Sequence, residues 1–133
     1  MDIYKTKRFA KWAKSEGLTD DNLDSALKEK ERGLKGDSLG SYIFKKCVAL
    51  AGRGKSGGAE TIVIYKQGDV ALFIYGYAKN DKAVLTSQEE QLRIFAKGFM
   101  TLTHNERLAK REAGELLVVK RTAIRNAKLY QIL

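Results

Sequence analysis

The chain has 133 residues, with 25 Lys and Arg against 16 Asp and Glu, and a formal net charge of +9. This length suits one domain with a real core, and the absence of a run of about eighteen apolar residues argues against a transmembrane helix. The charged start MDIYKTKRF is unlike a secretory signal, and the single Cys47 cannot form an internal disulfide, so we expect a cytoplasmic protein. No Cys/His cluster has metal-ligand spacing, so neither metal nor cofactor is expected. The positive charge favours nucleic acid, a ribosome or an acidic protein as partner.

The first third of the chain predicts a strand and a helical hairpin. Residues 2–5 (DIYK) favour a short edge strand. Apolar side chains at i, i+3 and i+4 predict helices over about 6–16 and 20–32, and Gly17 separates them. We expect residues 33–40 to form a loop.

Three segments that follow predict an antiparallel meander. YIFKKCVAL, AETIVIYK and VALFIYGYAK are rich in Ile, Val, Tyr and Phe, which favour strands. The run GRGKSGG at 52–58 joins the first two strands as a basic loop, and QGD at 67–69 joins the second pair as a tight turn.

The last part of the chain predicts helices around one ambiguous segment. Ser87, with Glu90 three residues on, is a capping-box start for a long helix, and 105–113 predicts a further helical piece. ELLVVK at 115–120 fits either a strand or a helix end. Residues 121–133 are basic and amphipathic at helical spacing. The fold class is therefore α+β, with a strand and helical hairpin packed on the meander and one or more C-terminal helices.

The glycine run resembles a nucleotide-binding P-loop, but its context excludes that function. A P-loop needs its first glycine where this chain has Ala49, and it needs a helix directly after Gly54-Lys55-Ser56. A strand follows instead, so no nucleotide cofactor is expected. Two interpretations of the run remain. The glycines would let the backbone, with the cations Arg53 and Lys55, approach a phosphodiester chain closely. Alternatively, the run is a flexible loop whose charges only aid solubility.

The third strand carries a candidate RNA-binding surface. Simple alternation divides its side chains into two faces: Phe73, Tyr75, Tyr77 and Lys79 on one, Leu72, Ile74 and Ala78 on the other. Tyrosines beside a lysine resemble surfaces on which RNA bases stack, each base contributing about 1–3 kcal/mol. We expect Phe73 to be core and Tyr77 and Lys79 to belong to the site.

The order of elements and two motifs resemble the RelE/ParE superfamily of bacterial toxins over roughly residues 1–120. GSYIFKKCVALAGRGKSGG and ETIVIYKQGDVALFIYGYAKND are similar to a RelE-like branch with a GKSGG loop and a YGFAKN-type segment. The resemblance implies a single toxin domain over 1–120, with 121–133 as a basic extension. It also implies inhibition by a cognate antitoxin and metal-independent cleavage of mRNA on the ribosome.

The resemblance also implies roles for individual residues. The ribose 2′-OH attacks the neighbouring phosphate, so a base, a charge stabiliser and a proton donor are required. The implied catalytic set, built from cations and one stacking tyrosine because the single His104 lies away from the meander, is Lys46, Arg53, Lys55, Lys79 and Tyr77. Further RNA contacts are expected from Lys45, Tyr75 and Lys82.

One departure from the branch keeps a second function open. Ala59-Glu60-Thr61 stands where that branch commonly has an arginine, and Cys47 stands where a basic residue is common. The carboxylate of Glu60 would repel phosphate and could neutralise Arg53 or Lys55. The alternatives are a non-catalytic toxin-fold protein that inhibits a gyrase-type target, and a plain RNA- or DNA-binding module aided by residues 121–133.

Overall fold

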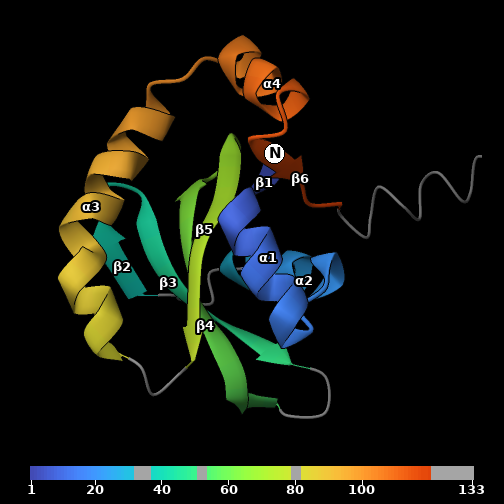
Figure 1. Cartoon of the computed structure of the whole chain (residues 1–133), viewed down its shortest axis with the longest axis vertical. Helices are drawn as coiled ribbons and strands as arrows, with labels where there is room; N and C mark the ends of the chain where they lie inside the picture. Colours follow the sequence, from blue (N-terminus) through green and yellow to red (C-terminus); the bar gives the residue numbers. More distant parts are fainter. Residues whose placement is uncertain (32–36, 51–53, 79–81, 121–133) are drawn as a thin grey trace, which may run out of the picture.

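A computed structural model describes residues 1–31, 37–50, 54–78 and 82–120 (Figure 1). Within these ranges, some residues are described by their backbone alone: 37, 50, 54–57, 78 and 82–87. The expected amphipathic helix at 121–133 lies outside the described residues.

Six strands form one mixed sheet in the order β2-β3-β4-β5-β1-β6. The strands are β1 (Asp2–Thr6), β2 (Asp37–Gly40), β3 (Ile43–Leu50), β4 (Gly54–Lys66), β5 (Val70–Ala78) and β6 (Leu116–Val118). Strands β3, β4 and β5 form the predicted antiparallel meander, and β1 runs parallel to β5. The α+β class is confirmed, and the ambiguous ELLVVK segment contains a strand, β6.

Two expectations about strands are corrected. Strand β1 is not at the edge of the sheet, because β6 pairs with its second side. The expected loop at 33–40 contains β2, which pairs antiparallel with β3. Its sequence DSLG has turn-forming residues rather than a strand pattern, so pairing with β3 holds it in the sheet.

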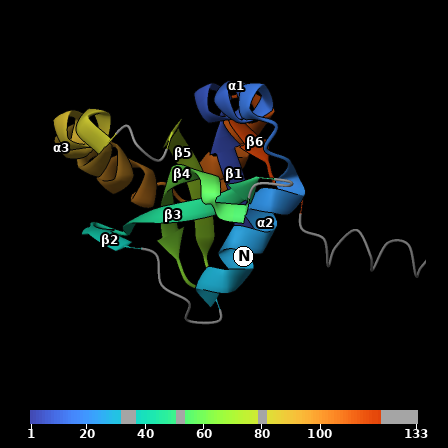
Figure 2. The same ribbon diagram turned by 90° about the horizontal axis from the view of Figure 1, so that it is seen from below.

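Four helices in the described part of the chain cover the two faces of the sheet and one end. They are α1 (Lys7–Glu16), α2 (Asp20–Glu31), α3 (Lys82–Met100) and α4 (His104–Glu112). Figure 2 shows α1 and α2 on one side of the sheet and α3 on the other. Helix α3 begins five residues before the expected start at Ser87, because KAVLTS contains no glycine or proline to prevent helix formation. The observed capping box is at α4, between Thr103 and Glu106.

Helix α1 begins and ends where its sequence predicts. The Thr6 hydroxyl accepts a hydrogen bond from the Phe9 amide at 3.1 Å, an N-cap worth about 1 kcal/mol. Gly17 ends the helix at φ 75°, in the left-handed region that glycine adopts readily. The ring of Phe9 then stacks on Phe73 of β5 at 5.3 Å between centroids, which anchors α1 to the sheet.

The sheet separates two hydrophobic cores. Beneath α1 and α2 the fully buried side chains include Phe9, Leu27 and Phe73. Beneath α3 they include Ile62 and Leu72. The side of the sheet to which a strand residue points therefore decides whether it meets the helical hairpin or α3.

Candidate nucleic-acid interface

A β-bulge in β5 sorts its aromatic side chains differently from simple alternation. The pairing of β5 with β4 slips by one residue between Phe73 and Tyr75, which leaves Ile74 as the extra residue. Phe73 packs in the core beneath α1 and α2, whereas Ile74 and Tyr77 belong to the core beneath α3 and Tyr75 packs against it. The expected grouping of Phe73 with the two tyrosines is wrong, although its expected burial is confirmed.

The bulge places both tyrosines on one surface with residues of β3 and β4. Two cross-strand rows make up this surface, which we call the α3 face: Lys45, Ile62 and Tyr75 in one row, and Cys47, Glu60 and Tyr77 in the next. Neighbouring strands are about 4.8 Å apart, so the backbones at Lys45 and Tyr75 are separated by roughly 10 Å. A cation and an aromatic ring thus flank one stretch of sheet on the same side.

The two tyrosines of the α3 face differ in accessibility. Tyr77 is only 4% exposed, while Tyr75 is half-buried. Their rings lie 6.2 Å apart, tilted by 35°. The ring of Tyr77, for which a stacking role is predicted, is therefore buried. Tyr75 presents the more accessible aromatic surface to a ligand.

Lys46 lies on the opposite side of the sheet from Lys45, as expected for neighbouring strand residues. Its ammonium group is 2.8 Å from Glu29 of α2, and Lys46 as a whole is 5% exposed. The backbone carbonyl of Lys46 also accepts a hydrogen bond from the buried Thr61 hydroxyl at 2.8 Å. These contacts place Lys46 between sheet and helix, away from the α3 face; its catalytic role stays a prediction.

The glycine run is mostly strand rather than loop. Strand β4 begins at Gly54, and β3 already pairs with it there. A Cβ at Gly58 would overlap the carbonyl oxygen of Val48, so this glycine allows close approach of two strands. Of the predicted cations, Arg53 and Lys79 lie outside the described residues, and the side chains of Lys55 and Lys82 lie outside the described part as well.

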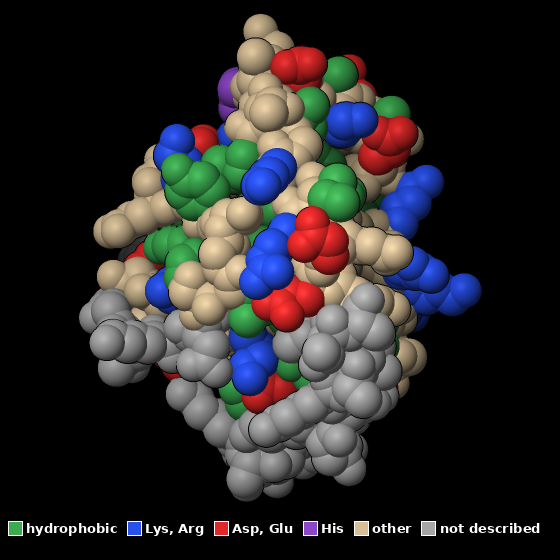
Figure 3. Space-filling model, turned by 90° about the vertical axis from the view of Figure 1, so that its left-hand side faces the viewer, with side chains coloured by type: hydrophobic (Ala, Val, Ile, Leu, Met, Phe, Trp, Pro, Cys, Tyr) green, Lys and Arg blue, Asp and Glu red, His purple; other side chains and the backbone are tan. Residues whose placement is uncertain are grey.

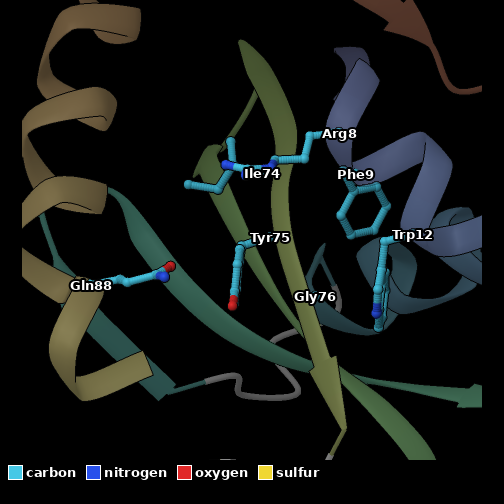
Figure 4. Close-up of a pocket in the computed structure, with 7 residues that line it drawn as sticks. All are labelled: Arg8, Phe9, Trp12, Ile74, Tyr75, Gly76 and Gln88. Atoms are coloured by element: carbon cyan, nitrogen blue, oxygen red, sulfur yellow. The ribbon is translucent and has the colours of Figure 1, made fainter. Parts of the chain in front are cut away.

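A groove between α1 and α3 crosses β5 beside Tyr75 (Figure 4). Arg8 of α1 extends across Ile74, and Gln88 of α3 points toward Tyr75 from the other side (Figure 4). Two adjoining hollows of about 330 and 310 Å³ share these four residues. Sequence reasoning missed Arg8 and Gln88, because no pattern in the chain links the start of one helix to a residue eighty positions later.

Charges of both signs occupy the α3 side of the molecule. Figure 3 shows Lys and Arg side chains interspersed with Asp and Glu among the side chains described there.

His104 begins α4 with a 62% exposed side chain, and its Nδ1 lies 3.5 Å from the Asp2 carboxylate. As expected, it is a surface residue at a helix end.

Neither a metal site nor a membrane span emerges from the described part of the chain. Among residues 1–31, 37–50, 54–78 and 82–120, no group of three or more His, Cys, Asp or Glu could hold a metal ion. In the same ranges no helix is both long and apolar enough to cross a membrane.

An ion pair fixes α4 to the turn between β4 and β5. Two guanidinium nitrogens of Arg107 lie 3.0 and 3.5 Å from the two carboxylate oxygens of Asp69. Arg107 is buried and its guanidinium also lies 5.5 Å from the centroid of the Phe99 ring. The hydrogen bonds from Arg107 hold the pKa of Asp69 below its ordinary value.

The lowered pKa of Asp69 predicts a loss of stability in acid. A carboxyl whose pKa is lower in the folded state stabilises the fold above its ordinary pKa of about 3.9, and that contribution disappears as pH falls through the folded pKa. Because the Asp69 side chain is 39% exposed, solvent screening limits the contribution to about 0.5–1 kcal/mol. In thermal unfolding followed by circular dichroism, Asp69→Asn should have a lower Tm than the wild type at pH 7. At pH 2 the difference in Tm between the two proteins should be smaller. Exposed Glu112, changed to Gln, is the control; equal pH dependence in both variants would contradict the prediction.

Comparison with known proteins identifies a family that matches most of the chain. The family model described as the RelE toxin of the RelE/RelB toxin–antitoxin system matches residues 1–119. No curated protein matched the chain. The matched segment contains every described helix and strand.

Proposed function

The chain belongs to the RelE toxin family, and from this membership we propose that it cleaves mRNA on the ribosome as a metal-independent endoribonuclease. Membership makes it the toxin of a toxin–antitoxin system, with an antitoxin protein as its partner. We also propose that the protein acts in the cytoplasm, where ribosomes translate the mRNA that it cleaves.

The chemistry requires cations more than it requires a histidine. When the 2′-oxygen attacks phosphorus, the 5′-oxygen of the next nucleotide leaves, and the phosphate passes through a state with additional negative charge. Fixed positive charges beside that phosphate stabilise it, which is commonly the largest single contribution to such catalysis. The proton of the 2′-OH must go to a base, and the leaving oxygen must receive one.

The observation that carries the proposal is the row of Lys45, Ile62 and Tyr75 on the α3 face. Lys45 offers a cation for the phosphate chain and Tyr75 an aromatic ring for a base, on one face of the sheet and on either side of the buried Ile62. Strands supply these residues, so their relative positions are fixed by the hydrogen bonds of the sheet. Within the proposal, Lys55 is a candidate base or phosphate clamp, and Arg53 stabilises the five-coordinate phosphate. Lys79 is a further cation of the site, and Lys82 contacts the RNA.

The test is induced expression in a bacterial host, with mapping of mRNA 5′ ends. New ends in translated messages, absent when translation is blocked, are expected. Growth arrest without new ends would overturn the proposal in favour of inhibition by binding.

Glu60 is the specific observation that favours a second function. It lies between Cys47 and Tyr77 in the second row of the α3 face, so its carboxylate is on the same side of the sheet as Lys45 and Tyr75. A negative charge there weakens attraction for phosphate. This position supports a toxin-fold protein that binds RNA or a gyrase-type target without cleaving.

Replacing Glu60 is expected to strengthen RNA binding. Removing one unscreened charge a few ångströms from a phosphate is worth about 1 kcal/mol, so Glu60→Gln should bind single-stranded RNA roughly fivefold more tightly at low salt. The difference should shrink as salt rises. Fluorescence anisotropy with a labelled oligonucleotide measures both effects. Glu112→Gln makes the same change in net charge on α4, and an equal gain in that variant would show that only net charge matters.

A further inference from the structure

The groove between α1 and α3 has polar groups on both walls and an apolar floor. Arg8 supplies a guanidinium from one side and Gln88 an amide from the other, with Ile74 and Tyr75 of β5 between them (Figure 4). Its continuation along α3 is lined by Leu92 and Phe95. The two hollows, about 330 and 310 Å³, lie at the lower end of the range for ligand pockets, about 300–1,000 Å³.

The groove is continuous with the α3 face through Tyr75, which belongs to both. The bulge at Ile74 is what brings this about. It turns Ile74 and Tyr75 to the same side of the sheet, where regular alternation would direct them to opposite sides. Bulges commonly redirect a side chain next to a functional site.

We propose that this groove binds a purine base of single-stranded RNA, and that Arg8 and Gln88 determine the base preference. The inference rests on the proposed function and adds the subsite. Unpaired RNA bases stack on aromatic rings and guanidinium planes and expose their polar edges to side chains. The ring of Tyr75 and the apolar side chain of Ile74 meet the face of the base, and the polar groups of Arg8 and Gln88 meet its edge.

Purines are favoured because of the hydrogen-bonding groups on the two walls. An arginine fork matches the O6 and N7 acceptors of guanine, and a glutamine amide matches the N6 donor and N7 acceptor of adenine. Pyrimidines have no N7, so they lack both of these Hoogsteen-edge pairs. One such bidentate contact is worth about 1–3 kcal/mol of discrimination, or roughly tenfold to a hundredfold in affinity.

The experiment compares binding of labelled (AG)6 and (CU)6 RNA by fluorescence anisotropy at fixed salt. The wild type should prefer the purine RNA about tenfold, and Gln88→Leu and Arg8→Lys should lose most of that preference while binding of (CU)6 changes less than twofold. Arg8→Lys retains the charge and removes the planar fork, which separates base recognition from phosphate attraction. Lys11→Ala, on the exposed side of α1, is the control and should weaken both RNAs equally.

The same variants are tested on mapped mRNA ends. If the wild type prefers purines in neither assay, or if Arg8→Lys and Gln88→Leu keep the full preference, the inference is overturned. Loss of antitoxin binding in these variants with unchanged RNA preference would also overturn it and assign the groove to a peptide. Purine-selective binding without cleavage would retain the groove and remove only the proposed ribonuclease activity.

Discussion

Lys45→Ala is expected to lower mRNA cleavage about a hundredfold, while Lys46→Met leaves it within a fewfold of the wild type. Loss of one positioned group that stabilises developing negative charge commonly costs about 10²–10³ in rate. Lys45 shares the α3 face with Tyr75, whereas Lys46 is buried against Glu29 on the other side of the sheet. The comparison uses neighbouring residues of one strand, so changes in net charge are matched.

The readouts are growth arrest on induction and the yield of new mRNA 5′ ends. Folding is checked by circular dichroism, because replacing one member of this partly buried ion pair affects stability. A Glu29→Leu, Lys46→Met double variant replaces both members by apolar side chains and tests whether any loss of activity in Lys46→Met comes from unfolding. If the folded double variant is inactive and Lys45→Ala is active, the site lies on the α2 side of the sheet, as the predicted catalytic role of Lys46 requires.

Gly76→Ala is expected to destabilise the protein by about 3 kcal/mol, a decrease in Tm of roughly 10 °C. A Cβ on Gly76 would overlap the ring of Trp12, which packs against Phe9 with centroids 5.5 Å apart. Either the ring moves out of its site or α1 moves away from β5. Since Arg8 is on the same helix, movement of α1 would also change the groove.

Gly98→Ala on α3 is the matched control. Apart from the backbone of α3 itself and the two neighbouring residues, no atom lies within 4 Å of a Cβ built there, so the substitution should stabilise the helix by about 0.5–1 kcal/mol. Adding Trp12→Leu to Gly76→Ala should cost much less than Trp12→Leu in the wild type, because the two sites are in contact and their effects are not additive. Thermal unfolding measures all four variants, and additive effects would contradict this explanation of the glycine.

Local signals in the sequence determined most of the elements. Thr6 and Gly17 bound α1 because a hydroxyl can cap a helix and a glycine can adopt a positive φ without reference to the rest of the fold. The meander followed from runs of β-branched and aromatic residues, and the two motifs in it indicated the family. The separation of Lys45 from Lys46 also followed, since successive strand residues point to opposite sides of a sheet.

Tertiary structure decided what these signals could not. One extra residue at Ile74 changed the sides of Tyr75 and Tyr77, because a bulge depends on the pairing of two strands and not on the strand alone. Likewise, the sequence did not show which face of β3 packs against α2. In the structure it is the face of Lys46, whose ammonium group lies 2.8 Å from the carboxylate of Glu29. The groove is the extreme case: Arg8 and Gln88 are eighty residues apart, and only the packing of α1 and α3 on opposite sides of β5 brings them to one cavity. The sequence by itself therefore determined most of the elements and the family, while long-range packing decided which side chains lie together.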